Sequence, residues 1–374
     1  MSESRKAATE LLETLSRLVE EFPDNEGPFS GDDDVADSLR TLVAHLGTGI
    51  ELQFDQSTAT PTFREIVTPW RKSLGDNADA RYWDAPVDPD GTYEITGNIA
   101  GAVYVSFTVE EGSQDGSFPT STAGVINDTD FDVGPDGDFT IRMGPGESAP
   151  NGMALGPGAS RLTVRYYWED ELSPHLQPAA DARLAIRLVD GTVDPGPRHP
   201  DDASIAASLR RLDRYLDTRV FKTRTDEESP AFVSRVPNEF VAPVVPGDHA
   251  LAAIDAHYSM APYLLGPDEA LVVRGRWPTC RCANVNLWTK NLATFDYSRH
   301  QVSLNRAQTA ADDEGRFVVV ISAEDPGVDN WLDTEGRAFG MVFWRFLLAE
   351  GEVEQLESEV LHTADVRAAI TTAG

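Results

Sequence analysis

Apolar and polar side chains alternate along two long stretches of the chain, residues 93–169 and 271–347. Residues 103, 105, 107 and 109 are valine or phenylalanine, and mostly polar side chains stand between them. A period of two is typical of β-strands. The pattern predicts strands at 93–97, 102–111, 124–133, 138–143 and 161–168 in the first stretch, and matching strands in the second.

Helical periodicity appears outside these stretches. Apolar residues recur three and four positions apart in residues 8–22 and 35–46, which predicts two amphipathic helices near the N-terminus. The same spacing predicts a helix that begins at Pro200, a second one at about 248–264, and a polar helix at 350–362. Residues 223–246 are rich in proline and charge, so we expect them to be extended.

The two alternating stretches are related to each other. Sliding the chain along itself by 178 residues places Gly97 on Gly275, and the interval from this glycine to the next aligned phenylalanine is the same in both copies (139 − 97 = 317 − 275). The same offset places Tyr167 on Arg345. A spacing shared across several turns indicates a duplicated unit.

These patterns predict a mainly β protein with helical additions. We expect two related antiparallel β-sandwich or jelly-roll-like units, because short turns separate the strands and a βαβ rhythm is absent. The expected regions are 1–50 (N-terminal helices), 51–198 (first β-unit with its preceding segment), 199–268 (helical and extended insertion), 269–349 (second β-unit) and 350–374 (C-terminal helix and tail). The sequence has no dinucleotide-binding or P-loop motif.

Charge narrows the choice of partners. The 374-residue chain has a formal net charge of −31. Nucleic acids and anionic membranes bind through clusters of Lys and Arg, so we expect neither as a partner. The N-terminal segment lacks the pattern of a signal peptide, and cytoplasmic residence is the expectation. The sequence leaves the oligomeric state open.

Several short motifs of the second stretch are similar to one known family. They are Val-Arg-Gly-Arg-Trp-Pro at 273–278, Asn-Trp-Leu at 330–332 and Phe-Trp-Arg-Phe-Leu at 343–347. With these motifs the stretch resembles domain of unknown function 1214, a bacterial and archaeal family often paired with domain of unknown function 1254. The chain departs from the family at Ala283-Asn284, where members commonly have an aromatic pair. The resemblance implies a jelly-roll-like fold and carbohydrate binding, and it implies no particular activity.

The loop at 325–337 is the main candidate for a ligand site. It combines carboxylates, an amide, an indole and a guanidinium in Asp325, Asn330, Trp331, Asp333 and Arg337. Sugar sites use such a set, because hydroxyls need donors and acceptors and the apolar ring face needs an aromatic surface. For Asn330, Trp331, Asp333 and Arg337, the 178-residue offset finds no chemical counterparts in the first copy, which has Gly152, Met153, Leu155 and Ala159 there. The alternative is that Trp331 fills the core and the carboxylates cap turns.

Positive charge concentrates in the second stretch of this acidic chain. Arg274 and Arg276 share one strand face, and the offset places Asn305-Arg306 on Asn127-Asp128. We therefore include Arg274, Arg276 and Asn305 among the candidate ligand-binding residues. A network of ion pairs between the two units is an equally good explanation.

An acidic row is the candidate metal site. Asp128, Asp130 and Asp132 would project to one face of a strand and could hold a divalent cation or perform paired acid–base chemistry. Solvent-facing acids are the alternative, since the row lacks the turn glycine of a calcium loop. Cys280 and Cys282 are too few for a zinc site and are expected to be thiols inside a strand. No other cofactor is expected.

The sequence favours a small-ligand binding protein, with a pocket at the second β-unit for a polyhydroxylated or partly apolar ligand such as a glycan fragment. Two alternatives remain open. An enzyme, either a carboxylate-based hydrolase or a lyase, would need two carboxylates about 5–9 Å apart in one cleft. A structural or assembly protein would expose a large apolar patch instead of a pocket.

Overall fold

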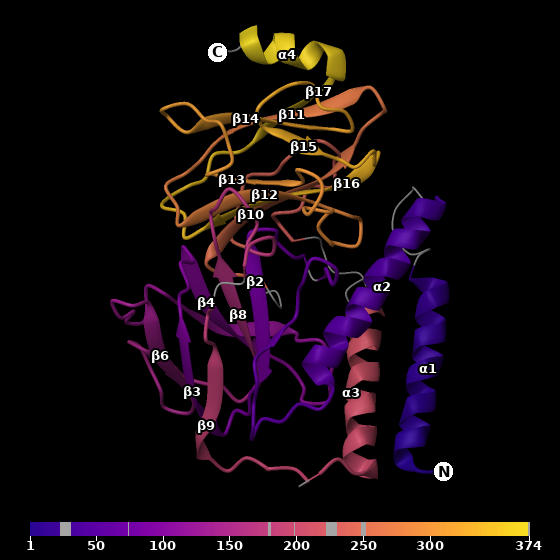
Figure 1. The fold of residues 1–374 in the computed structure, drawn as a ribbon, viewed down its shortest axis with the longest axis vertical. Helices are drawn as coiled ribbons and strands as arrows, with labels where there is room; N and C mark the ends of the chain where they lie inside the picture. The colour runs from indigo at the N-terminus through magenta and orange to yellow at the C-terminus, as the bar shows by residue number, and fades with distance from the viewer. Residues whose placement is uncertain are drawn as a thin grey trace.

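The computed structural model describes residues 1–22, 31–73, 75–178, 181–197, 199–221, 230–247 and 252–372. Within these residues the chain is mainly β, with four helices and four sheets. The sheets form two sandwich-like units stacked along the long axis of the molecule, and helices lie beside them (Figure 1). The predicted fold class, two related β-units with helical additions, is confirmed.

The first unit consists of two sheets. One sheet contains, in spatial order, β1 (Arg64–Glu65), β2 (Ala80–Pro86), β8 (Ala159–Tyr167), β4 (Tyr104–Glu111) and β5 (Ser121–Asn127). The other contains β7 (Gly152–Met153), β6 (Asp138–Met143), β3 (Gly91–Asn98) and β9 (Ala185–Gly191). Apolar side chains between the two sheets form one buried cluster, the first sandwich core.

The second unit repeats this plan. Its first sheet contains β10 (Ala256–Leu264), β16 (Phe339–Leu347), β12 (Cys282–Trp288) and β13 (Ser303–Asn305). Its second sheet contains β15 (Trp331–Asp333), β14 (Arg316–Ser322), β11 (Glu269–Arg276) and β17 (Glu357–His362). A second apolar cluster fills the space between them.

The strand order is the same in both units, as the internal repeat predicts. The order β2-β8-β4-β5 corresponds to β10-β16-β12-β13, and β7-β6-β3-β9 corresponds to β15-β14-β11-β17. The other pairs of these strands are antiparallel, but β6 pairs with β7 in parallel, and the equivalent strands β14 and β15 do the same. The expectation of one shared topology is confirmed.

The constant offset of 178 residues is wrong for the last strands. Arg165 pairs with Ser106 in the first unit, and Arg345 pairs with Asn284 in the second. The equivalent of Arg345 is therefore Arg165, at an offset of 180, and not Tyr167. The strand pairs give an offset of 179 for β7 and β15 and of 180 for β8 and β16. The second unit therefore has one additional residue before β15 and another between β15 and β16. The extra residues fall in loops, which accept insertions at little cost.

Three helices pack beside the β-units. Helix α1 (Glu3–Glu21) and helix α3 (Asp202–Phe221) lie side by side, while α2 (Asp32–Gln53) spans the height between the units (Figure 1). The N–H of Glu3 donates to Asp202 at 2.9 Å, and Arg17 pairs with Asp217 at 2.5 Å, so α1 and α3 run parallel. Their apolar faces share one cluster with the outer faces of β2, β8, β10 and β16.

Two predicted helices are wrong. The segment predicted as a helix at 248–264 forms strand β10 from Ala256 on, and residues 248–251 lie outside the described residues. Pairing with the whole of β16 satisfies one edge of this apolar run, and residues 232–244 form hydrogen bonds with part of the other edge. Both faces of the strand are largely buried. The predicted helix at 350–362 is also wrong: residues 350–356 form no helix or strand, and residues 357–362 form β17, which pairs with the open edge of β11.

These changes move the domain boundaries. The second unit begins at β10 rather than at residue 269, and it ends with β17 rather than at residue 349. Among the described residues, α4 (Thr363–Thr372) follows it, above the outer sheet (Figure 1). No helix among the described residues combines the length and the apolar character needed to cross a bilayer.

Candidate functional site

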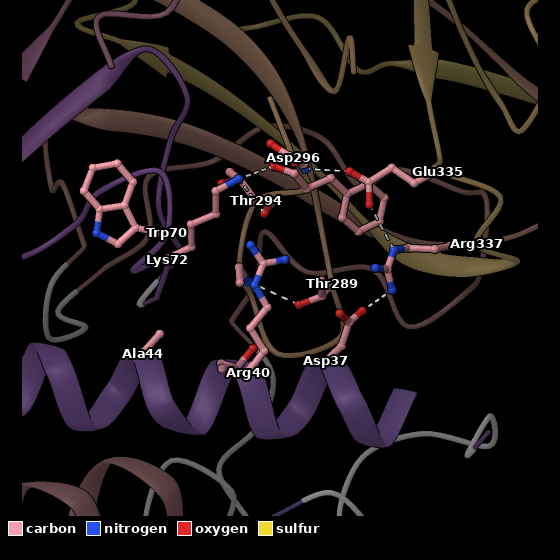
Figure 2. A pocket seen from close by; sticks show the side chains of 13 residues that line it. Asp37, Arg40, Ala44, Trp70, Lys72, Thr289, Thr294, Asp296, Glu335 and Arg337 are labelled. Carbon is pink, nitrogen blue, oxygen red and sulfur yellow. Dashed lines mark hydrogen bonds and ion pairs between the residues drawn. The ribbon is translucent and has the colours of Figure 1, made fainter. Parts of the chain in front are cut away.

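A polar groove lies where α2 meets the loops of the second β-unit (Figure 2). Its volume, including the open mouth, is about 400 Å³. Four segments that are distant in sequence form its walls: α2, the turn at 68–72, and the loops at 289–296 and 335–337. The charged and aromatic lining consists of Asp37, Arg40, Trp70, Lys72, Phe295, Asp296, Glu335 and Arg337.

Trp70 stands at the mouth of this groove. It lies at the tip of a tight turn in which Thr68 and Arg71 exchange backbone hydrogen bonds of 3.1 Å. Pro69 precedes it, a residue favoured at the second position of such turns. The indole side chain is 78% exposed, an uncommon state for so large an aromatic residue. Trp70 thus offers a bare aromatic surface next to charged groups (Figure 2).

Lys72 forms the inner end of the groove. Its ammonium group donates to the carbonyl oxygen of Thr294 at 3.2 Å and to that of Phe295, and it lies 3.9 Å from the centre of the Tyr297 ring. Burial lowers the pKa of Lys72 to about 8, although Asp76 acts in the opposite direction. Asp76 accepts from the N–H and hydroxyl of Thr294, and burial raises its pKa. Through these contacts Lys72 and Asp76 are both held against the loop at 294–296.

Glu335 and Arg337 form the wall opposite Lys72. Arg337 pairs with Asp37 of α2 and contacts Glu335 at 3.4 Å, and its guanidinium lies 5.1 Å from the centre of the Phe295 ring. Glu335 accepts the N–H of Asp296 at 2.6 Å. Glu335 has a φ of 54°, which is costly for a residue other than glycine and is often found at functional sites. These contacts tie α2 to the second unit.

The groove continues past Asp296 and Glu335 into a shallower hollow that Arg40 also lines. In this hollow His300 Nδ1 lies 2.7 Å from Asp333 Oδ2. Asp333 also accepts the N–H of Glu335 at 2.7 Å, so one carboxylate orients both the imidazole and the Glu335 turn. Asp296 has a pKa below its ordinary value: partial burial acts to raise it, but hydrogen bonds from Ser298 and the charge of Lys72 outweigh that effect.

The structure brings two of the predicted ligand residues to this groove, Asp333 and Arg337. The other members of the 325–337 loop serve the fold. Asp325 accepts the N–H of Gly327 in a turn, and Trp331 donates to the carbonyl oxygen of Ser322. Asn330 is 6% exposed and holds the backbone of Ala310 and Val318, so it is not available to a ligand.

The predicted arginine face does not meet the groove. Arg274 pairs with Glu359 at 2.5 Å, and Arg276 pairs with Glu354 at 3.5 Å, so both tie the outer sheet to the chain around β17. Asn305 is buried at the junction of the units, where it donates to Asp79 at 3.1 Å. The proposed network of ion pairs between the units exists, although its partners differ from those predicted: Arg281 pairs with Asp128, and Arg306 with Glu169.

The acidic row does not form a metal site. Strand β5 ends at Asn127, so the row lies in a turn rather than on one strand face. Asp128 pairs with Arg281, Asp130 accepts the N–H of Asn127, and Asp132 accepts from Asn151. Within the described part of the chain, no group of three or more His, Cys, Asp or Glu side chains has the geometry to hold a metal ion.

Most of the groove was missed in the sequence. Asp37, Arg40, Trp70, Lys72, Asp296 and Glu335 come from distant segments, and no spacing relates them. One signal was available: a tryptophan directly after a proline, in a segment without apolar alternation, indicates an exposed turn.

A larger hollow lies between α3 and the first unit, with a volume of about 1,920 Å³ including open solvent. Its wall consists mainly of loops, and no Trp, Tyr or Phe occurs among the described residues that line it. The groove beside Trp70 is smaller but combines aromatic and charged groups, as small-molecule sites usually do.

Comparison with known proteins supports the fold. An uncharacterised protein from Burkholderia cenocepacia has a solved structure that matches this one with a TM-score of 0.79 and 23% identity, over 96% of this chain and 97% of that chain. The VPA0106 protein from Vibrio parahaemolyticus matches with a TM-score of 0.47 and 14% identity, over 77% of this chain and 90% of that chain. The 11S allergen from Cocos nucifera matches with a TM-score of only 0.20 and 12% identity, over 83% of this chain and 90% of that chain.

No protein-family model matches the chain, and no curated protein matches it. The similarity to domain of unknown function 1214 therefore stays a prediction. The Burkholderia structure shows that this two-unit fold occurs in a second protein of nearly the same extent.

Proposed function

We propose that the groove beside Trp70 binds a small polyhydroxylated ligand, with a sugar or short glycan as the best fit. The observation that carries this proposal is the 78% exposed indole of Trp70 at the mouth of a groove with charged walls. An exposed aromatic ring packs against the apolar face of a pyranose, while nearby donors and acceptors bind its hydroxyls.

The charge balance of the groove favours a neutral ligand. Its described lining contains the cationic side chains of Arg40, Lys72 and Arg337 and the acidic side chains of Asp37, Asp296 and Glu335. Equal numbers of each sign give little net attraction for an anion or a cation, but they supply many hydrogen-bonding partners.

Binding is favoured over carboxylate-driven hydrolysis. A glycosidase needs a carboxylic acid with a raised pKa to protonate the leaving group. Asp296 and Glu335 line both the groove and the shallower hollow beside it. The pKa of Asp296 is below its ordinary value. Glu335 is held by the N–H of Asp296 and by Arg337, which suits an ionised acceptor of hydrogen bonds.

The test is a calorimetric titration of the protein with a panel of mono- and disaccharides. Trp70→Ala should weaken the binding of a sugar hit by about tenfold, since aromatic contacts of this kind contribute about 1–2 kcal/mol. Because the indole is exposed, this variant should keep the melting temperature of the wild type. Glu335→Gln should also weaken binding, and Asp325→Asn, which changes a turn carboxylate outside the groove, is the matched control.

Unchanged affinity in both Trp70→Ala and Glu335→Gln would place the sugar site elsewhere. If no sugar in the panel binds the wild type, the ligand class is wrong, whatever the role of the groove.

A further inference from the structure

The two β-units carry the same row of polar residues across equivalent sheets. In the first unit the strand register places Tyr82, Arg165, Ser106 and Asn127 side by side. In the second unit the equivalent positions are Tyr258, Arg345, Asn284 and Asn305. Each row therefore reads Tyr, Arg, a small polar residue and Asn, although the two sequences differ widely around it.

These rows lie on the outer faces of the sheets. Neighbours such as Trp83 and Val164 pack into the first sandwich core, whereas Tyr82 and Tyr167 belong to the cluster shared with the helices. Since successive residues of a strand point to opposite faces, Arg165 projects outward with Tyr167. The outer faces of β2 and β8 thus meet those of β10 and β16 where the units stack (Figure 1).

A cavity lies at this junction. Its volume, including its opening, is about 390 Å³. Tyrosine and arginine from both rows line it, together with residues of the segment that leads to β2: Val67, Ser73, Gly75, Asp76, Tyr82, Thr163, Arg165, Tyr167, Tyr258 and Arg345. It is separate from the groove beside Trp70, with which it shares no lining residue.

The two arginines differ in their partners. Arg165 is 3% exposed, donates to the hydroxyl of Thr108 at 2.5 Å and lies 3.7 Å from the buried carboxylate of Glu110. The position equivalent to Glu110 in the second unit is Trp288, because Glu110 pairs with Arg161 and Trp288 with Met341. The second row therefore lacks the carboxylate that the first row has.

Arg345 is a buried cation without an ion pair among the described residues. It is 6% exposed, and its Nε and Nη1 atoms have no hydrogen-bond partner there. Its guanidinium lies 5.0 to 5.5 Å from the ring centres of Phe343, Tyr258 and Tyr167. A guanidinium keeps its charge when buried, so this arrangement is costly unless an anion compensates it.

The acids near Arg345 form no ion pair with it among the described residues. The charge of Arg345 acts on Asp79, but the carboxylate of Asp79 accepts hydrogen bonds from Asn284 and Asn305 instead. Asp76 accepts two hydrogen bonds from Thr294 and lies near Lys72, and burial raises its pKa. Burial also raises the pKa of Tyr82 and Tyr167, so both keep their hydroxyl protons at neutral pH and can donate to an anion.

We propose that this cavity binds a small oxyanion, a carboxylate or phosphate group, between the two β-units, with Arg345 as its main ligand. Nε and Nη1 lie on different edges of the planar guanidinium, and each has an N–H without a partner among the described residues that can donate to an oxygen of such a group. The ring surfaces around Arg345 exclude water and strengthen the interaction. This site is independent of the sugar site proposed above.

The test measures the melting temperature and the calorimetric binding of the full chain with inorganic phosphate and with acetate. Sodium chloride at equal ionic strength controls for screening. At least one of the two anions should raise the melting temperature of the wild type by mass action, and the larger effect identifies phosphate or carboxylate as the preferred group. No effect of either anion beyond that of chloride would overturn the proposal.

Arg345→Met tests the assignment. It removes a buried charge without a partner, so the variant should fold with unchanged or higher stability and lose the anion-dependent shift. Arg281→Met is the matched control: Arg281 also lies at the junction of the units, but it pairs with Asp128 and does not line the cavity. An equal anion-dependent shift in Arg345→Met and wild type would overturn the proposal.

If Arg345→Met does not fold, Arg345→Lys gives the same answer. Lysine keeps the charge but loses the fixed Nε and Nη1 donors of the guanidinium, so affinity for the anion should fall by about tenfold or more while the protein remains folded. Unchanged affinity in a folded Arg345→Lys would exclude Arg345 as the ligand.

Discussion

Asn151 and Asn330 occupy equivalent positions in the two β-units and form the same hydrogen bonds to the backbone. Asn151 accepts the N–H of Asp132 at 2.6 Å, and Asn330 accepts the N–H of Ala310, the residue equivalent to Asp132, at 2.7 Å. The backbone carbonyl oxygen of each asparagine also accepts an N–H of the neighbouring strand: Asn151 accepts that of Arg142, and Asn330 accepts that of Val320. The offset of 178 placed Asn330 on Gly152 because it ignored the residue added before β15. With the offset of 179 both units have an asparagine here, so this asparagine is a feature of the fold.

Asn330→Ala should therefore lower stability rather than binding. The side chain donates to the carbonyl oxygens of Ala310 and Val318 and accepts one N–H, all in a buried site. Removing these bonds leaves buried backbone groups unsatisfied, so the free energy of unfolding should fall by about 2–3 kcal/mol. Urea unfolding measures this change. Asn151→Ala, at the less buried equivalent, should cost less, and a larger loss there would contradict the comparison.

Lys72 should make stability rise at alkaline pH. Its pKa is about 8 in the folded protein, below the value of about 10.4 expected in the unfolded chain. Between these values the unfolded chain binds more protons, so the free energy of unfolding increases as pH rises, by up to about 3 kcal/mol for this group. Urea unfolding of wild type and Lys72→Met at about pH 7.5 and about pH 10 isolates the effect. An equal pH dependence in both proteins would rule it out.

His175 should contribute to acid denaturation. Burial lowers its pKa to about 4, and its Nε2 lies 2.9 Å from the carbonyl oxygen of Ala80. The unfolded pKa of about 6.5 is higher, so the stabilising contribution is present above pH 6.5 and is lost as pH falls towards 4. His175→Gln should flatten the pH dependence of the melting temperature in this window. An unchanged slope in His175→Gln relative to the wild type would contradict this prediction.

Calcium or magnesium at millimolar concentration should not raise the melting temperature. Asp128, Asp130 and Asp132 are already bound to protein donors, and the structure does not gather them around one point. A metal that binds the folded state would stabilise it by mass action. The metal site would be restored by a rise in melting temperature that sodium chloride at equal ionic strength does not reproduce and that disappears in Asp128→Asn.

Strand patterns predicted the β-units well because alternation reflects burial of one sheet face against another. The same reasoning failed at β10, where both faces are covered: Tyr258 contacts the helix-side cluster while Ala261 and Tyr263 fill the sandwich core. An apolar run buried on both sides carries no period of two and resembles a buried helix. At β17 the polar residues of an edge strand gave equally little evidence of pairing.

The site was harder to predict than the fold. Arg337 and Asp333 were recognised because they stand in one loop with unusual composition. Asp37, which pairs with Arg337, stands 300 positions earlier in the chain, and the packing of α2 against the second unit brings the two together. Lys72 reaches the same groove from the turn at 68–72. Neither residue is distinctive where it stands in the sequence.

The duplication also explains how one chain can hold one buried anion site rather than two. In a dimer of identical subunits a substitution appears on both sides of the interface, so both arginines would gain a carboxylate or neither would. A tandem chain is free of that constraint. Glu110 neutralises Arg165 in one copy, while Trp288 occupies the matching place in the other and leaves Arg345 with its charge. Covalent linkage of the copies thus allowed them to specialise, one as support and one as recognition surface.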